Sequence, residues 1–575
     1  MAGLLKIVSF QYKHLPGHGP DEIDRRTVSR GSMLKNEMYS FQALYRAPEG
    51  TSCLAVSVSA ETELPIGSWR VDYVPLTSAA DPHGDAGYVS DQPGLYPDLL
   101  MPRPAAPEIV RQKTAWGHTF FEAETDSLLN AVPDFQSVWF TVNPDSSELE
   151  AGIYPIRINM TSLADGTIHA SETLTVEVIG TSLPEQMAYY TNWFHVDCLC
   201  DLFDTEPYSD TFYRIFDDYL RNMTRHRQNT LLLPAFTPPL DTPVGVERRN
   251  VQLVEIEKTG DGWTFGFGKM RQFLRHAADG GIRYFEHCHL FSQWGAKNAP
   301  NIYDRNGKRI FGYDTDASGE EYRTFLRAYL KAFLIFTEEE GIHDRLLFHL
   351  SDEPTLSQLA SYRNAHDMVA DILKDQIIAD AMSDLKFYEE GLVDHPIFFI
   401  SHADAVDSQC SNLWLYYTGS TTPRCTNRLI SNTSARTRVL GLQLYRYNAR
   451  GFLHWAYNFY YDRLSAGCYD PKSAPNAYKM LPGVTFLAYP VLGRGTCVVP
   501  SIREKLMAEA FDDFRALKLL ETRIGREAVL ELCERRLGTV SWQTIPEEDA
   551  LISLREEVNR RIRDTLIGLD SVYIV

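Results

Sequence analysis

The chain has 575 residues, roughly four times the ~150 residues of a typical domain, so two or three domains are expected. Hydrophobic residues make up 44% and charged residues 23%, which excludes a disordered, collagen-like or coiled-coil protein. Lys and Arg total 56 against 76 Asp and Glu, a formal net charge of −20 with no Lys/Arg-rich block, so nucleic acid and anionic membrane surfaces are excluded as expected partners.

The cysteines and the first residues indicate the compartment. Nine cysteines, an odd number spread from Cys53 to Cys533, do not suggest a disulfide framework and favour reduced thiols. The N-terminal residues lack the charged, apolar and small-residue regions of a secretion signal, and no run approaches ~18 apolar residues. We therefore expect a cytoplasmic protein without a membrane span, unless a signal has been removed. The oligomeric state stays open.

The first 184 residues alternate between apolar and polar side chains in short runs separated by Gly, Pro, Asp and Asn. This period of two, with frequent turns, is typical of an antiparallel β-sandwich, which we expect over residues 1–184. The runs are 52–60, 69–76, 137–144, 154–160 and 173–180.

Helical and strand patterns alternate after Pro184, which indicates a (β/α)₈ barrel over residues 185–500. The eight predicted strands are 187–194, 229–233, 283–289, 345–351, 376–380, 396–401, 413–417 and 451–459. Residues 251–267 predict a β-hairpin inserted after the second strand, because alternating residues flank a Gly-Asp-Gly turn. Helical spacing over 501–575 predicts C-terminal helices that pack on the barrel.

The strongest local signal is the stretch from Arg345 to Pro354, a buried strand that ends in the adjacent acids Asp352 and Glu353. Residues at the C-terminal ends of barrel strands line the active site, so both acids are expected at the mouth of the fourth strand. Sugar cleavage needs a proton donor and a stabilising anion, which two carboxyl groups supply. The alternative to a catalytic role is that the acids and Pro354 form an ordinary turn between a strand and a helix.

The adjacency of the two acids limits the mechanism. Neighbours in sequence come from one side of a pocket, so they are poorly placed to flank a sugar as nucleophile and acid. In substrate-assisted hydrolysis the 2-acetamido oxygen of the substrate attacks the anomeric carbon, one carboxylate holds the acetamido N–H, and its neighbour acts as acid and then base. This mechanism predicts a 2-acetamido sugar as substrate.

Several segments in order along the chain resemble glycoside hydrolase family 123, whose characterised members are retaining β-N-acetylgalactosaminidases. The segments are YPDLLMP (96–102), VWFTVNP to AGIYPIRI (138–158), TNWFHVD (191–197), HLSDEP (349–354), LWLYY (413–417), RVLGLQLYRYNARGFLHWAYNFY (438–460), PGVTFLAYP (482–490) and SIREKLMAEAFDDF (501–514). The resemblance implies that Glu353 is the acid/base and that Asp352 orients and stabilises the acetamido group.

The chain departs from the family pattern at two places. This chain has Gly483-Val484 where the family usually has Gly-Asp. It has Ala508-Glu509-Ala510 where the last helix of the family pattern has Arg-Glu-Gly. The first departure removes a possible polar contact in the pocket and leaves the leaving-group specificity open.

Seven further residues are candidate sugar contacts on chemical grounds. Tyr416, near the end of the seventh strand, is placed to donate to the acetamido carbonyl, with a buried structural tyrosine as the alternative. Trp455 is expected to form the apolar bottom of the pocket for the N-acetyl methyl group or to stack on the sugar ring. The alternative is a tryptophan that only packs in the core. Trp193 and His195 are expected to point the same way on the first strand, as are His287 and His289 on the third, because strand side chains alternate. The last candidate is Asn458, which follows the eighth strand.

His287-Cys-His289 also resembles the His-x-His pair of barrel metallohydrolases. The sequence shows no motif that would supply the other metal ligands of those enzymes, so we expect no metal. It also shows no Gly-rich phosphate-binding loop, so we expect no nucleotide cofactor.

The adjacent acids predict a hydrolase of a 2-acetamido sugar that needs no cofactor and acts on a glycan or glycoconjugate. The resemblance further implies a retaining, exo-acting enzyme that removes terminal β-linked N-acetylgalactosamine. The alternatives are a β-N-acetylhexosaminidase of other sugar specificity and a carbohydrate-binding barrel protein without turnover.

Overall fold

The structure is a computed structural model that describes most of the chain. The described residues are 4–46, 56–81, 85–103, 109–113, 119–123, 135–240, 248–260, 262–419, 424–462, 467–476, 480–493 and 495–570. Cys53 and the start of the first alternating run, 52–55, lie outside them.

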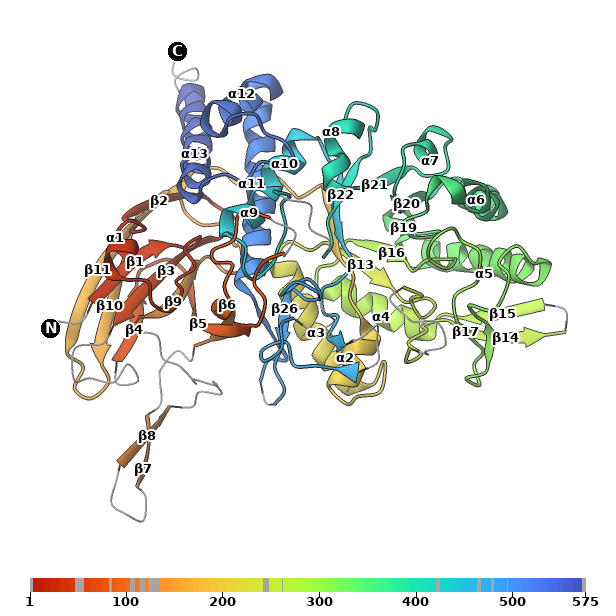
Figure 1. The fold of residues 1–575 in the computed structure, drawn as a ribbon, viewed down its shortest axis with the longest axis horizontal. Coiled ribbons are helices and arrows are strands. Elements are labelled where there is room, and N and C mark those ends of the chain that lie inside the picture. The colour runs from red at the N-terminus through yellow and green to blue at the C-terminus, as the bar shows by residue number, and fades with distance from the viewer. Residues whose placement is uncertain are drawn as a thin grey trace.

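The N-terminal region forms two main sheets (Figure 1). One has the order β1 (Leu4–Ser9), β3 (Tyr39–Arg46), β9 (Gln136–Val142), β5 (Ile66–Leu76), β6 (Gly94–Pro102), and every pair is antiparallel. The other has the order β2 (Arg30–Leu34), β11 (Ile168–Ile179), β10 (Gly152–Ser162), β4 (Val56–Glu61). Strands β2 and β11 pair in parallel, so the expectation of purely antiparallel strands is wrong there. The short helix α1 (Pro20–Asp24) and the hairpin of β7 (Ile109–Lys113) and β8 (Thr119–Ala123) complete this region.

One hydrophobic cluster is shared by the two main sheets, because alternate side chains of each strand point between them. Phe41 and Phe140 of the first sheet stack with ring centroids 5.2 Å apart. Ile158 and Val176 of the second sheet belong to the same buried cluster. The apolar residues of the alternating sequence pattern are therefore the ones buried between the sheets.

Eight parallel strands follow and form a nearly closed barrel, as predicted. In chain order they are β12 (Tyr189–Asn192), β13 (Thr230–Leu233), β16 (Tyr284–His287), β19 (Leu346–Phe348), β20 (Ile377–Met382), β21 (His395–Phe399), β22 (Trp414–Tyr416) and β23 (Gly451–His454). Each overlaps one predicted run. The backbone N–H of Asn229, just before β13, donates to the carbonyl of Tyr190 in β12 at 3.2 Å and links the two ends of the sheet.

Helices occupy the connections between these strands. They are α2 (Val196–Leu202), α3 (Asp210–Arg225), α4 (Gly268–Asp279), α5 (Glu320–Glu339), α6 (Leu359–Leu373), α7 (Lys386–Glu389), α8 (Ala403–Val406), α9 (Ser434–Arg438) and α10 (Leu440–Arg446), with the 3₁₀ turns η2 (His343–Arg345), η3 (Leu356–Gln358) and η4 (Ile400–His402). The predicted hairpin within 251–267 is present as β14 (Glu255–Thr259) and β15 (Gly262–Gly266). Smaller hairpins are β17 (Ile302–Tyr303) with β18 (Arg309–Phe311), β24 (Tyr461–Asp462) with β25 (Gly467–Cys468), and β26 (Ala488–Pro490) with β27 (Val498–Pro500).

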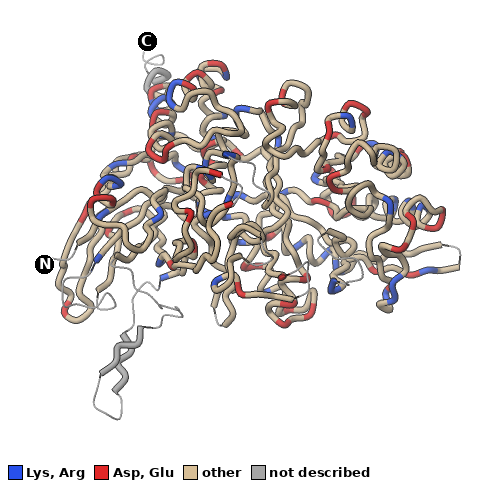
Figure 2. Tube along the Cα trace, in the orientation of Figure 1, with Lys and Arg blue, Asp and Glu red and all other residues tan. Residues whose placement is uncertain are grey.

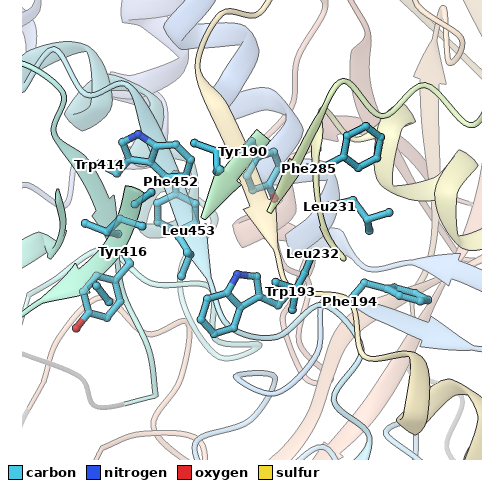
Figure 3. Close-up of a cluster of buried hydrophobic side chains, with 14 of the residues drawn as sticks. Tyr190, Trp193, Phe194, Leu231, Leu232, Phe285, Trp414, Tyr416, Phe452 and Leu453 are labelled. Atoms are coloured by element: carbon cyan, nitrogen blue, oxygen red, sulfur yellow. The ribbon is translucent and has the colours of Figure 1, made fainter. Parts of the chain in front are cut away.

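The inside of the barrel changes from aromatic to polar along the strands. Tyr189 packs against Tyr284 at 4.5 Å and Trp414 at 4.8 Å between ring centroids, where the strands begin. Two residues further on, Thr191 and Glu286 meet through a hydrogen bond of 2.6 Å. Figure 3 shows the buried side chains around these strands, including Trp193 and Tyr416 at their far ends. The polar layer thus lies directly below the mouth of the barrel.

The helix α11 (Ile502–Ile524) lies between the N-terminal sheets and the barrel (Figure 1) and is buried over most of its length. Its Phe511 stacks on Tyr190 of β12 with centroids 4.2 Å apart. The helices α12 (Arg526–Leu537) and α13 (Glu548–Asp570) follow it. Arg555 of α13 binds Glu37, so the end of the chain returns to the N-terminal region.

Acidic and basic side chains are interspersed along the whole trace (Figure 2), which agrees with the absence of a basic block in the sequence. None of the helices that the structure describes is long and apolar enough to cross a membrane.

Candidate active site

Asp352 and Glu353 lie on a turn directly after β19, at the C-terminal end of the fourth barrel strand. Asp352 is 8% exposed, and Glu353 is less buried. Glu353 has φ 45°, in the left-handed region, although it precedes Pro354 and such residues normally adopt an extended conformation. Its N–H donates to the carbonyl of Ala381 at 3.1 Å. A strained backbone held in place by neighbours is typical of functional sites.

A buried carboxylate fixes the start of this turn. Asp380, at 0% exposure in β20, accepts hydrogen bonds from the backbone N–H of Leu350 at 3.0 Å and from that of Ser351 at 3.2 Å. Tyr362 of α6 donates its hydroxyl to the same carboxylate at 2.6 Å. These bonds position the backbone that immediately precedes Asp352.

His349 lies between two carboxylates inside the barrel. Its Nε2 is 3.1 Å from Glu286 and its Nδ1 is 3.3 Å from Asp380. Burial by itself lowers the pKa of His349, but the hydrogen bonds and charges of Asp380 and Glu286 outweigh it and raise the pKa to about 10. His349 is therefore an imidazolium at neutral pH. Glu286 also accepts from the indole N–H of Trp193 at 3.4 Å.

The structure brings Tyr416 to the two adjacent acids. Its hydroxyl donates to Oε1 of Glu353 at 2.6 Å, whereas the expected partner of the phenol was the acetamido carbonyl of a substrate. Burial, and then the neighbouring carboxylate of Glu353, raise the pKa of Tyr416 well above its usual value, so the phenol keeps its proton. The bond joins the ends of β19 and β22 across the barrel.

Gln293 and Trp294 are neighbours of Asp352 that the sequence did not indicate. Nε2 of Gln293 donates to Oδ2 of Asp352 at 2.9 Å, and the backbone N–H of Trp294 donates to the carbonyl of Asp352 at 3.0 Å. Both residues lie in the irregular connection after β16, which has no periodicity to read. The only available signal was a tryptophan within the polar stretch FSQWGAKN (291–298).

His195, Trp455 and Asn458 form a second group that joins the segments after β12 and β23. The side chain of Asn458 accepts from the N–H of His195 at 2.8 Å and donates to its carbonyl at 3.2 Å. Nε2 of His195 lies 2.9 Å from the carbonyl of Trp455. Burial and the nearby guanidinium of Arg248 lower the pKa of His195 to about 4, so this imidazole is neutral. The indole of Trp455 is the more open surface in this group.

The expectation that His287 and His289 share a face is wrong. Glu286 points into the barrel, so alternation turns His287 outward, where its Nε2 meets the hydroxyl of Tyr329 in α5 at 2.7 Å. The strand ends at His287, and the chain then turns His289 inward to stack on His349 with centroids 4.8 Å apart. Burial, and then His349, lower the pKa of His289, which stays neutral.

Trp193 and His195 diverge in the same way, because β12 ends at Asn192. Trp193 reaches the interior group around Glu286, whereas His195 belongs to the group of Trp455.

The donor atoms of His289, His349 and Asp380 lie within 4.8 Å of one another, as metal ligands would. Both ring nitrogens of His349 already face carboxylates, Nε2 that of Glu286 and Nδ1 that of Asp380. Neither nitrogen is open to a metal in this arrangement, so the group does not fit a metal site.

Val484, at the position where the family pattern has Asp, is fully buried. The preceding Gly483 has φ 84°, and its carbonyl accepts from Nη1 of Arg503 at 2.7 Å. An apolar side chain therefore fills this position.

Comparison with known proteins agrees with this architecture. The model of the glycoside hydrolase 123 catalytic domain matches residues 193–520, more than half of the chain. A family 123 glycoside hydrolase from Clostridium perfringens, studied for the hydrolysis of glycolipid glycans, has a similar structure, with a TM-score of 0.70 and 13% identity over 100% of this chain and 99% of that one.

Two other glycosidases are only weakly similar. A β-galactosidase from Marinomonas ef1 has a TM-score of 0.32 and 9% identity over 59% of this chain and 61% of its own. A maltogenic α-amylase from Thermotoga neapolitana has a TM-score of 0.31 and 12% identity over 57% and 76%. No curated protein sequence matches the chain. The match to the catalytic-domain model shows that the chain belongs to glycoside hydrolase family 123 and is a glycoside hydrolase.

Proposed function

We propose that this enzyme removes terminal β-linked N-acetylgalactosamine from glycans, as a retaining, exo-acting hydrolase that uses the acetamido group of the substrate as nucleophile. One observation carries the proposal: the two available acids are adjacent on a single turn. Glu286 and Asp380, two other carboxylates of the barrel interior, are 0% exposed and bound to His349. They are not free to act from the opposite side of a sugar.

In the first step the acetamido carbonyl oxygen forms a bond to the anomeric carbon while the glycosidic C–O bond breaks. Glu353 donates its proton to the leaving oxygen, and Asp352 accepts a hydrogen bond from the acetamido N–H and offsets the positive charge of the resulting oxazolinium ion. In the second step the Glu353 carboxylate takes a proton from water, which attacks the anomeric carbon and reopens the ring. Two inversions at one carbon give retention.

The surrounding contacts support these roles. Gln293 donates to Oδ2 of Asp352, and Tyr416 donates to Oε1 of Glu353, so the two carboxylates are held separately. Trp455 and Trp193 are the aromatic surfaces proposed to contact the sugar, with His195, His289 and Asn458 supporting them. The N-terminal sheets, packed as a sandwich, brace the barrel.

The galacto configuration rests on the family resemblance, and a glycolipid headgroup as substrate rests on the similarity to the clostridial enzyme. A panel of 4-nitrophenyl glycosides tests the first point. The β-N-acetylgalactosaminide should be cleaved fastest; faster cleavage of the gluco epimer, or comparable cleavage of a sugar without the acetamido group, would contradict the assignment.

Variants of the two acids test their roles. Glu353→Gln should slow an unactivated glycoside by ~10²–10⁴-fold and spare the first step of a substrate with a good leaving group, because general acid catalysis is what is lost. Asp352→Asn should slow both substrates and weaken inhibition by a thiazoline that mimics the cyclic intermediate. Asp375→Asn, at an exposed position before β20, is the control. Full activity in both acid variants would place the catalytic site elsewhere.

A further inference from the structure

Trp294 exposes a large apolar surface beside the catalytic turn. Its side chain is 60% exposed, although burying an indole is one of the most favourable contributions a residue can make to folding. Leu356, three residues after Glu353, is 51% exposed. Two of the large apolar side chains that the structure shows to be exposed therefore flank the acids.

The backbone at Trp294 is strained. Trp294, Gly295 and Ala296 have φ of 57°, 105° and 55°, three consecutive residues in the left-handed region, which a bulky aromatic residue rarely adopts. Gly295 is required at the centre, since a Cβ there would lie 2.9 Å from Cβ of Gln358. Strain and exposure together are costly for a residue without a function.

The segment is nevertheless held firmly to the catalytic turn at both ends. The N–H of Trp294 donates to the carbonyl of Asp352 at 3.0 Å, and its carbonyl accepts from Nε2 of Gln358 at 2.6 Å. Gln358 ends η3, the turn that follows Pro354, and a capping box with Thr355 fixes it. The position of Trp294 is therefore coupled to that of the acids.

We propose that Trp294 is the stacking platform for the sugar ring on the leaving-group side of the scissile bond, an inference that rests on the function proposed above. Glu353 protonates the glycosidic oxygen, so the departing saccharide leaves past this rim and not through the barrel interior, where Trp193 is 4% exposed. The ligand class is a pyranose that presents an open C–H face, and galactose serves as its probe below. Flat aromatic faces bind such surfaces by apolar contact.

The test compares two substrates that differ only in the leaving group. One is a disaccharide with terminal β-linked N-acetylgalactosamine on galactose, and the other is β-N-acetylgalactosaminyl fluoride, whose leaving group has no ring. Trp294→Ala should lower kcat/KM for the disaccharide by about five- to tenfold, as expected for the loss of an aromatic contact, and leave the fluoride unchanged. Trp294→Phe should restore most of the loss.

The control is Met187→Ala, which removes a side chain that is 66% exposed just before β12, at the opposite end of the barrel. It should change neither substrate. An equal loss on both substrates in Trp294→Ala would mean that Trp294 acts through Asp352, and no loss on either would mean that it has no role; each result overturns the proposal.

Binding of the acceptor separates this proposal from the proposed function. Free methyl β-galactoside, titrated by NMR line broadening, should bind to the wild type and not to Trp294→Ala. If the wild type hydrolyses neither substrate but still binds the galactoside better than Trp294→Ala does, the proposed function is wrong and the role of Trp294 in binding the sugar is supported. If the galactoside binds equally to both proteins, the platform fails.

Discussion

At the scale of residues, the turn that carries Asp352 and Glu353 depends on a buried charge. His349 lies between Glu286 and Asp380, and Asp380 in turn holds the backbone of Leu350 and Ser351. The imidazolium of His349 lies in a buried layer where burial alone would disfavour a charge, and the contacts with the two carboxyl groups offset that cost. The neutral ring of His289 stacks on His349, and burial, helped by the charge of His349, also lowers the pKa of His287.

This arrangement predicts a pH dependence of stability. A folded-state pKa of about 10, above the usual 6.5, means that the stabilisation is fully present below pH 6.5 and is lost as the pH rises toward 10. His349→Gln should therefore remove up to about 1.4 kcal/mol per pH unit from the slope of the unfolding free energy in that window. Urea denaturation of both proteins at several pH values measures this. Identical slopes would show that His349 is neutral in the folded protein.

The sequence indicated Asp352, Glu353 and Tyr416 because each lies at or shortly after the end of a strongly apolar strand in a barrel pattern. It could not indicate Gln293 or Trp294, since their positions depend on an irregular connection. It misplaced His287 because alternation holds only within a strand, and β16 is shorter than the apolar run suggested.

At the scale of elements, all eight barrel strands and the inserted hairpin could be predicted from periodicity, whereas the parallel pairing of β2 with β11 could not, because pairing direction has no local signal. The crossing of α10 and α11 could not be predicted from the sequence either. It depends on Gly441, whose absent side chain lets the two backbones approach: a Cβ there would lie 1.9 Å from the carbonyl oxygen of Ala510.

Gly441→Ala should therefore destabilise the protein by about 1–3 kcal/mol, because backbone atoms cannot move aside cheaply. Gly268→Ala, at the start of α4 where a Cβ would meet nothing within 4 Å, should be neutral or stabilising by up to about 1 kcal/mol. Thermal unfolding of both variants under one condition gives the comparison. A stability loss of equal size in both would show that the helices do not cross at Gly441.

At the scale of the whole molecule, buried ion pairs join the N-terminal sheets to the C-terminal half. Arg503 of α11 binds Asp98 of β6 at 3.0 Å, Arg555 of α13 binds Glu37 at 2.6 Å, and Arg436 of α9 binds Asp85 at 2.5 Å. Removing one partner of such a pair leaves an uncompensated buried charge, which costs about 3–5 kcal/mol, so these contacts tie the stability of the two parts together.

We therefore expect the sheets and the barrel to unfold together. Loss of activity, of near-ultraviolet circular dichroism and of far-ultraviolet circular dichroism should coincide in urea, as in a single cooperative transition. Asp98→Asn, which leaves Arg503 without its carboxylate, should shift all three curves to lower urea. Two separate transitions, with the barrel surviving the sheets, would contradict this coupling.

The most direct test of substrate-assisted catalysis uses substrates whose acetamido group carries zero, one, two or three fluorine atoms. Fluorine withdraws electrons from the carbonyl oxygen, so if that oxygen attacks the anomeric carbon, kcat should fall steeply at each step of the series. Equal rates across the series, or a covalent glycosyl ester on Asp352 or Glu353 trapped with a 2-fluoro sugar, would show that the nucleophile comes from the protein.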